Sequence, residues 1–447
     1  MRTNTQAIHT ERAFEGGLAR SPRGVEQLLR QTATCLLFED TFYASGSTIA
    51  NEIAATAATC SPVVIAEVAT LAREDFKLRH VPLWLLVQLN KQRATAPLGL
   101  IATTIERVIQ RPDEMGEFLA LLAKDGKAPV KKVLTAQVKK GLARAFRKFS
   151  AYQLAKWNRD AEIKLRDVMF LVHPKPRDAE QAHDWACLVD GVMAPADTWE
   201  VALSAGADKK DTWERLLRED KLGYIALLMN LRNMVEARVN PALVEKALIS
   251  KSRGSRALPF RFVSAAKYAP SFAQAVSDAM VAALEGEDKL AGTTYLVLDV
   301  SGSMDAPLSN KGELTRLEAG AALGVLLREV CEHARVFTFS NSLIEVHNLR
   351  GLALMKGISQ SQMHGGTALA ESLRRLYQSA PTPDRIIVVT DEQTSDGITS
   401  LPAGVKGYLV NVAPYAPGLE TGARWTRING FSERVVDFVR WHEANPT

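Results

Sequence analysis

The stretch that decides the fold is Thr294-Tyr-Leu-Val-Leu-Asp-Val-Ser-Gly-Ser303, an apolar run that ends in one carboxylate and two hydroxyls. Its continuous apolar character predicts a buried strand over residues 294–300. Carboxylate and hydroxyl oxygens are the hard ligands that Mg²⁺ prefers. A threonine after a Gly-Gly pair and an aspartate after the apolar run 385–390 add two further oxygen ligands. The candidate ligands of a divalent cation, with Mg²⁺ expected, are Asp299, Ser301, Ser303, Thr367 and Asp391.

Strand-like and helix-like segments alternate through residues 290–447. The pattern predicts strands over 294–300, 335–339, 385–390 and 407–412, and helices over 316–331, 369–377 and 431–441. Such alternation is typical of right-handed βαβ units in a doubly wound parallel sheet, whose ligands bind beyond the carboxyl ends of the strands. Asp299 and Asp391 fall at such ends. The Asp-x-Ser-x-Ser motif with its downstream Thr and Asp resembles the metal-ion-dependent adhesion site of von Willebrand factor A domains.

Residues 24–285 have a different pattern, in which apolar residues recur at three and four positions. Helix breaks are expected near Ser45-Gly46, Arg111-Pro112, Gly126, His173-Pro174, Gly206, Asn240-Pro241 and Ala269-Pro270. So many short helices cannot easily share one compact centre. The sequence therefore predicts an α-solenoid of stacked helix pairs, although no clean repeat is visible.

Composition limits the class of protein. No segment approaches the roughly 18 apolar residues of a membrane helix, and residues 1–20 have no apolar signal region. Cys35, Cys60, Cys187 and Cys331 are scattered, which is typical of reduced thiols in a cytoplasmic protein. The net charge is +5, and because residues 291–447 carry 14 Lys and Arg against 16 Asp and Glu, residues 1–290 carry +7. This excess permits a polyanionic partner.

A basic run lies within the helical region. Residues 131–159 hold nine Lys and Arg and no acid, with apolar residues at helical spacing, which predicts one amphipathic helix with a cationic face. A solvated helix surface usually mixes both charge signs, so we favour an anionic partner, nucleic acid first, over a merely solvated face. Tyr152 and Trp157 could stack on bases or pack in the core. The candidate phosphate-binding residues are Lys132, Lys139, Lys140, Arg144, Arg147 and Lys148.

Four stretches carry a family resemblance. They are residues 35–46 (Cys-Leu-Leu-Phe-Glu-Asp-Thr-Phe-Tyr-Ala-Ser-Gly), 164–176 (Lys-Leu-Arg-Asp-Val-Met-Phe-Leu-Val-His-Pro-Lys-Pro), 227–234 and 258–264. With the downstream A-type domain they resemble the TROVE family of Ro-like ribonucleoprotein components over residues 20–447. The resemblance implies HEAT-like helical repeats over 20–287, closed into a ring by a von Willebrand factor A-like domain over 290–447.

The same resemblance implies a function in RNA quality control. Relatives bind small non-coding Y RNAs on a basic outer surface and 3′ ends of misfolded RNAs in a central hole, and some work with an exoribonuclease. His173 matches a position near the RNA-binding surface, although its place before Pro174 is equally typical of a helix C-terminus.

The sequence therefore favours a non-catalytic RNA-binding protein over two alternatives. One is a protein-interaction scaffold whose metal site captures an Asp or Glu of a partner. The other is a hydrolase with Ser301 as nucleophile, but the chain lacks a Gly-x-Ser-x-Gly elbow around this serine. The chain also lacks a Walker A loop, so nucleotide chemistry is unsupported.

Overall fold

The chain divides into a helical unit and a sheet unit in the computed structural model. The structure describes residues 25–34, 46–255, 257–308, 314–413, 419, 424–429 and 433–445. Of these, residues 28–288 and 433–445 form the helical unit, and residues 289–429 form the sheet unit. The predicted features at residues 1–20 and 35–45, Cys35 among them, lie outside the described residues.

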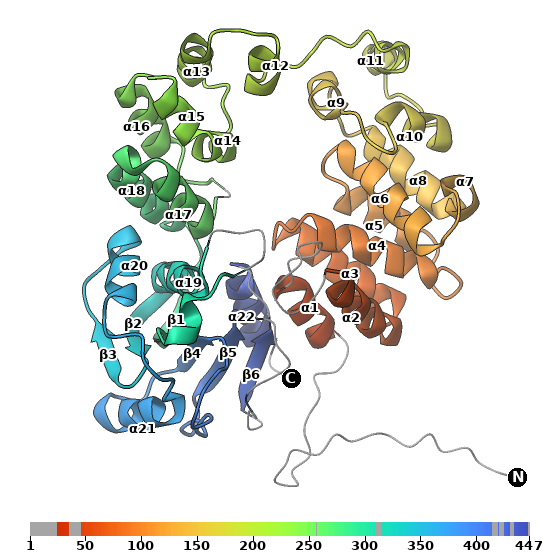
Figure 1. Cartoon of the computed structure of the whole chain (residues 1–447). Coiled ribbons are helices and arrows are strands. Elements are labelled where there is room, and N and C mark those ends of the chain that lie inside the picture. Colours follow the sequence, from red (N-terminus) through yellow and green to blue (C-terminus); the bar gives the residue numbers. More distant parts are fainter. Residues whose placement is uncertain are drawn as a thin grey trace, which may run out of the picture. The chain divides into compact units, whose positions relative to one another are not determined.

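Short helices make up the helical unit. Helix α3 packs on α4 and on α5, and α4 also packs on α6. Successive pairs therefore stack, as in an α-solenoid. In chain order the helices are α1 (Val25–Thr34), α2 (Gly46–Thr59), α3 (Pro62–Glu74), α4 (His80–Lys91), α5 (Leu100–Val108), α6 (Asp113–Asp125), α7 (Val130–Val133), α8 (Ala136–Phe146), α9 (Ala151–Trp157), α10 (Leu165–Val172), α11 (Ala179–Asp190), α12 (Trp199–Ser204), α13 (Lys209–Arg218), α14 (Tyr224–Met229), α15 (Leu231–Glu236), α16 (Pro241–Ser250), α17 (Pro259–Tyr268), the 3-10 turn η1 (Pro270–Phe272), α18 (Ala273–Leu284) and α22 (Val435–Ala444) (Figure 1).

The predicted helix breaks coincide with helix ends. Pro112 precedes α6, and Gly126 ends it. The Asn240 side chain accepts a hydrogen bond from the Ala242 N–H at 3.0 Å, which caps α16. Ala269 follows the last residue of α17. Local turn chemistry therefore sets the helix boundaries in this unit.

A buried ion pair links two layers of the helical unit. Arg73 of α3 donates a hydrogen bond to Glu114 of α6 at 2.6 Å, and the Glu114 side chain is fully buried. Glu114 also accepts the backbone N–H groups of Gln110 and Arg111 at 2.9 and 3.0 Å. A buried charge with this many partners is held in one place, so it fixes how α3 and α6 pack.

The sheet unit contains six strands within the described residues, in the order β3-β2-β1-β4-β5-β6. All neighbouring strands are parallel except β2 and β3, which are antiparallel. The chain leaves β1 towards β2 and later returns to the other side of β1 as β4, so the ends of β1 and β4 mark a topological switch point. The elements are β1 (Leu290–Asp299), η2 (Gly302–Asp305), α19 (Arg316–Val330), β2 (Cys331–Phe339), β3 (Leu343–Val346), α20 (Gly351–Ser359), α21 (Leu369–Ser379), β4 (Arg385–Thr390), β5 (Lys406–Asn411) and β6 (Trp425–Asn429).

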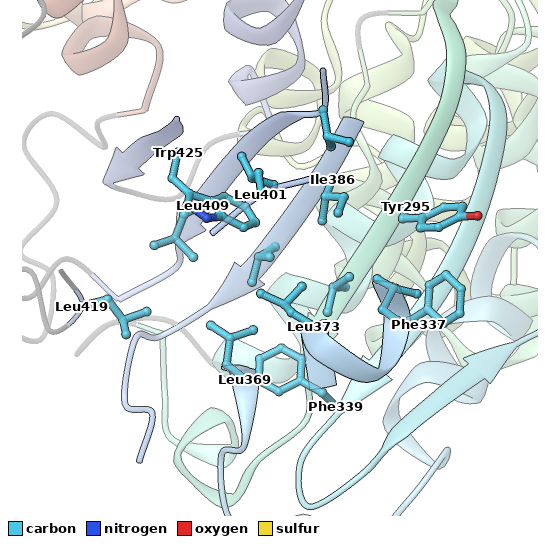
Figure 2. Close-up of a cluster of buried hydrophobic side chains, with 14 residues drawn as sticks. Tyr295, Phe337, Phe339, Leu369, Leu373, Ile386, Leu401, Leu409, Leu419 and Trp425 are labelled. Atoms are coloured by element: carbon cyan, nitrogen blue, oxygen red, sulfur yellow. The ribbon is translucent and has the colours of Figure 1, made fainter. Parts of the chain in front are cut away.

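Helices cover both faces of this sheet. On one face, Tyr295 and Phe337 pack with Leu369 and Leu373 of α21 in a buried apolar cluster (Figure 2). On the other face α19 packs on β1 and β2, so closely that a Cβ at Gly324 would lie 2.6 Å from Leu298. The two faces together hold β1 rigidly up to its last residue.

No helix in the described part of the chain is long and apolar enough to cross a membrane.

Candidate functional site

The loop after β1 folds back onto the carboxylate that ends the strand. The Ser301 N–H donates a hydrogen bond to Asp299 Oδ1 at 2.9 Å. The next N–H, that of Gly302, donates to the Gly365 carbonyl at 3.1 Å. The Asp-x-Ser-x-Ser loop is therefore tied to the Gly-Gly segment that leads to Thr367.

Hydroxyl and carboxylate oxygens from the ends of β1 and β4 converge. Ser301 Oγ lies 3.2 Å from Ser303 Oγ, and Ser303 Oγ donates to Asp391 Oδ1 at 3.1 Å. Both Ser301 and Asp391 are buried. The structure thus brings together predicted ligands that are about 90 residues apart in the sequence.

Asp299 lies deepest in this group. Thr390 Oγ1 donates to Asp299 Oδ2 at 2.5 Å, while the Ser301 N–H occupies its other oxygen. Burial raises the pKa of the Asp299 carboxyl to about 6, against the hydrogen bonds from Ser301 and Thr390, which lower it. Asp299 is therefore placed to orient the serine loop.

Thr367 is buried beside the Gly-Gly turn, and its carbonyl accepts the Ser395 N–H at 3.1 Å. Asn341, just beyond β2, accepts the Gly366 N–H at 2.9 Å. A Cβ at Gly365 would lie 2.2 Å from the Asn341 side-chain amide, so any other residue here would displace that amide. Within the described residues no hydrogen bond joins the Thr367 hydroxyl to the other four candidate ligands. Thr367 is thus near the group without being bonded to it.

A further participant, Arg316, was missed by the sequence analysis. Its guanidinium donates to Asp391 Oδ2 at 2.8 Å and to the Ser303 carbonyl at 3.2 Å. The residue is only 3% exposed. One signal was present in the sequence, because a cation in the first turn of a helix is unfavourable next to the positive end of the helix dipole unless an anion compensates it.

The gathered oxygens fit a hard divalent cation. Serine hydroxyls and two aspartates at a strand-end switch point supply the ligand chemistry that Mg²⁺ prefers. In the described part of the chain no group of three His, Cys, Asp or Glu could hold a metal ion. A cation at this site would therefore depend on the hydroxyls of Ser301 and Ser303 as much as on the two carboxylates.

The basic run is divided among three helices, so the prediction of one amphipathic helix over residues 131–159 was wrong. The breaks come from capping side chains. Thr135 accepts the Val138 N–H at 3.3 Å and begins α8, and Ser150 accepts the Gln153 N–H at 3.3 Å and begins α9. The apolar seam survives where it was expected, because Val138, Leu142, Ala145 and Phe149 are all buried.

Four of the predicted phosphate-binding residues point to solvent. None of them forms an ion pair with an acidic residue within the described ranges. Since their charges are not neutralised locally, they are available to an external anion. These four residues, called here the open cations, are Lys132, Lys139, Lys140 and Arg147.

The other two cations of this set have partners in α5. Arg144 lies 3.5 Å from the Glu106 carboxylate, and both side chains are more than a third exposed. Lys148 donates to the backbone carbonyls of Glu106 and Ile109 and so caps the C-terminus of α5. Desolvation lowers the pKa of the Lys148 amine. Lys148 thus has a clear structural role, while Arg144 is only weakly engaged.

The two aromatic residues of the basic run differ in their surroundings. Tyr152 is 50% exposed at the start of α9, with Lys156 Nζ 6.0 Å from its ring centroid. Trp157 is half-buried beneath the Arg111 guanidinium, 3.5 Å from the ring centroid, and Arg159 lies 4.9 Å away. The Tyr152 ring is therefore more accessible for stacking than Trp157, which has the guanidinium groups of Arg111 and Arg159 against it.

His173 ends α10 in a left-handed conformation with φ of 49°, and its N–H donates to the Met169 carbonyl at 2.9 Å. The interpretation as a helix C-terminal residue is thus confirmed. The side chain is exposed, and Phe170, one turn earlier, is 56% exposed. Phe170 was missed as a candidate stacking residue, because it lies within the apolar run 168–172 and only the structure shows that it is exposed.

The comparisons with known proteins agree with this architecture. The TROVE domain family model matches residues 192–285. The predicted resemblance to the TROVE family is confirmed over this segment. The crystal structure of the RO (RSR) protein of Deinococcus radiodurans is similar to this chain with a TM-score of 0.65 at 19% sequence identity, and the match covers 94% of this chain and 100% of that chain. The predicted fold class, a helical solenoid followed by a doubly wound, mostly parallel sheet domain, is thereby confirmed.

The TROVE match has a defined place in the fold. Residues 192–285 begin after α11 and end after α18, so the matched segment contains helices α12 to α18. The open cations on α7 and α8 lie before it, and the candidate cation site lies after it. Neither site is therefore identified by the TROVE match, and each depends on its own geometry.

Proposed function

We propose that this chain is a non-catalytic RNA-binding protein that holds RNA phosphates with the open cations. The observation that carries the proposal is that Lys139, Lys140 and Arg147 are exposed on and beside α8 without acidic partners in the described residues. Phosphate contacts of this kind dominate nucleic-acid affinity and release counterions. The TROVE match and the similarity to a Ro protein support RNA as the polyanion.

The proposed RNA is small, non-coding and Y-like, with 3′ ends of misfolded RNA as a second ligand class in RNA quality control. The exposed rings of Tyr152 and Phe170 favour unpaired nucleotides, because a base must be unstacked before it can stack on a side chain. An exoribonuclease is the proposed protein partner. Cys60 and Cys187 are free thiols, which is consistent with a cytoplasmic protein.

We further propose that the candidate site in the sheet unit binds Mg²⁺. The hydroxyls of Ser301 and Ser303 would bind directly, Asp299 and Asp391 directly or through water, and Thr367 as a third neutral ligand. The ion would supply an electrophilic position for a carboxylate or phosphate of a partner. The chain's own residues preorganise the loop, because Asp299 already accepts the Ser301 N–H.

A protein-interaction scaffold remains the second candidate, and this cation site is the observation that favours it. In that case chelation of divalent ions would abolish capture of the acidic partner, whereas RNA binding by the open cations would survive. A hydrolase has less support, because Ser301 Oγ contacts Ser303 Oγ, and His364 is bonded to Asp305 and to the Ser359 carbonyl.

The test is fluorescence anisotropy with a labelled RNA stem-loop that ends in a single-stranded 3′ tail. Charge reversal at Lys139, Lys140 and Arg147 should weaken binding by about tenfold or more, since attraction to at least three phosphates becomes repulsion. The matched control reverses Lys209, Lys210 and Lys246, which are exposed on α13 and α16 and change the net charge equally. Equal loss in both variants, or no loss in either, would refute the proposal.

A further inference from the structure

An arginine is bonded inside the candidate cation site. Arg316 is 3% exposed and Asp391 is fully buried, and their closest atoms are 2.8 Å apart. The same guanidinium nitrogen donates to the Ser303 carbonyl at 3.2 Å. Arg316 therefore forms an ion pair with the Asp391 carboxylate and a hydrogen bond with the backbone carbonyl of Ser303.

Three protein donors already occupy most of the acceptor capacity of the Asp391 carboxylate. Its Oδ1 accepts the Ser303 hydroxyl at 3.1 Å and the Gln393 N–H at 3.2 Å. Its Oδ2 accepts the Arg316 guanidinium. A divalent cation that bound Asp391 directly would share the carboxylate with these donors, and the strongest of them carries a full positive charge.

Electrostatics makes the arginine a competitor of the cation. The guanidinium neutralises the carboxylate that would attract the ion, and it also repels the ion across a few ångströms of buried space, where charges are screened little. Its position at the first residue of α19 adds the positive end of the helix dipole to this repulsion. Both effects lower the affinity for a divalent ion.

The same contacts keep the site assembled without an ion. A buried carboxylate that lacks a counter-charge is strongly destabilising, so a site made only of aspartates and hydroxyls would depend on bound metal. Arg316 supplies that counter-charge and also holds the Ser303 carbonyl. The loop can thus keep its ligand geometry in the metal-free protein.

We propose that Arg316 is an internal cation that competes with the divalent ion for Asp391, so that the wild-type site binds Mg²⁺ weakly and stays folded without it. This inference rests on the metal site under the proposed function. It assigns Arg316 as a positioning and affinity-setting residue. Mg²⁺ binding would then be favoured only when a partner's carboxylate or phosphate contributes a further negative charge.

The test is isothermal titration calorimetry of the full chain with Mg²⁺, on wild type, Arg316→Gln and Arg316→Lys. Arg316→Gln keeps a hydrogen-bond donor for the Ser303 carbonyl and loses the charge, so its Mg²⁺ affinity should rise by about tenfold or more. Arg316→Lys keeps the charge and should stay as weak as wild type. The double variant Arg316→Gln/Asp391→Asn loses the ligand charge and should lose the gained affinity.

Thermal unfolding gives an independent readout. The unfolding temperature of wild type should be the same in EDTA and in Mg²⁺, whereas that of Arg316→Gln should be lower in EDTA and recover in Mg²⁺. If Arg316→Gln folds only in Mg²⁺, the inference is supported. If Arg316→Gln fails to fold in both conditions, the double variant Arg316→Met/Asp391→Asn is measured, because it removes both charges. This double variant should fold, with an unfolding temperature that does not depend on Mg²⁺. Its failure to fold would contradict the inference.

The outcomes separate the inference from the metal site itself. Wild type that binds Mg²⁺ as tightly as Arg316→Gln would overturn the competition and leave the metal site standing. Absence of Mg²⁺ binding in both proteins would overturn the metal site and the inference together. RNA affinity is measured separately and should be the same for wild type and Arg316→Gln.

Discussion

Lys140 in the helical unit and Arg316 in the sheet unit show two opposite uses of a cation. Lys140 is exposed on α8 and has no acidic partner within the described residues. Arg316 is buried, with Asp391 2.8 Å away. The charge of Lys140 is available to an external polyanion, whereas the charge of Arg316 is neutralised by Asp391 inside the fold. The difference shows that a count of charges in the sequence does not reveal which of them act on partners.

The largest effect should come from a buried cation that loses its partner. Glu114→Ala leaves Arg73 buried without its carboxylate, and it also frees the Gln110 and Arg111 N–H groups. We expect the free energy of unfolding of the helical unit to fall by about 3–5 kcal/mol in urea titrations. The control, Glu117→Ala, removes a half-exposed partner of Arg79 and should cost less than about 1 kcal/mol. Equal costs would contradict the distinction between buried and exposed charges.

Exposed aromatic residues should matter to RNA and not to folding. Tyr152→Ala should weaken RNA binding by about 1–3 kcal/mol, the range for one base stacked on an aromatic ring, and leave the unfolding free energy unchanged. Tyr152→Phe keeps the ring and should bind like wild type in the same anisotropy assay. If the phenylalanine variant were as weak as the alanine variant, the hydroxyl and not stacking would carry the contact.

His173 offers a test in which stability and binding move in opposite directions. Because its φ is 49°, His173→Gly should remove the cost of a left-handed side-chain residue and stabilise the protein by about 1 kcal/mol. Loss of the exposed imidazole should at the same time weaken RNA binding. His173→Asn, which also tolerates this backbone conformation, serves as the control for chain geometry. A stabilised variant with unchanged RNA affinity would leave His173 with a purely structural role.

The smallest effect concerns pH. Asp305 accepts His364 Nδ1 at 2.9 Å, and this hydrogen bond raises the pKa of His364 above its ordinary 6.5. The imidazolium–carboxylate pair therefore contributes its full stability below pH 6.5 and loses it as the pH rises through the raised pKa. Because Asp305 is half exposed, we expect a loss of only about 0.5 kcal/mol, measured by urea unfolding across this range. Asp305→Asn should flatten that dependence, and an unchanged slope would rule out the pair as its source.

The sheet unit was predictable because its strands are apolar and end abruptly in polar residues. The predicted strand over 385–390 coincides with β4, and Asp299 ends β1 as expected. The short β3 and the edge strand β6 were missed. Residues 343–346 include Glu345 and are only partly buried, so their sequence lacks the apolar run that marked the central strands. A continuous apolar pattern thus identifies central strands and not edges.

The convergence of the candidate oxygen ligands was predictable, whereas the counter-charge beside them was not. Ser301, Ser303 and Asp391 form a motif because each is a recognisable oxygen ligand next to a strand end. Arg316 was marked only by its place in the first turn of a helix, which does not reveal the anion that it contacts. In the helical unit, Thr135 and Ser150 were visible as helix caps, and reading them would have divided the basic run correctly. The composition of the basic run, taken alone, did not reveal the helix breaks at Thr135 and Ser150.

The most direct test of the central claim, that the open cations hold RNA phosphates, is the salt dependence of RNA affinity. The dissociation constant is measured over a series of KCl concentrations for wild type and for a variant with glutamine at Lys139, Lys140 and Arg147. We predict that the slope of log affinity against log salt becomes shallower by about 2, since each single-strand phosphate contact contributes about 0.7. Identical slopes for the two proteins would contradict the account.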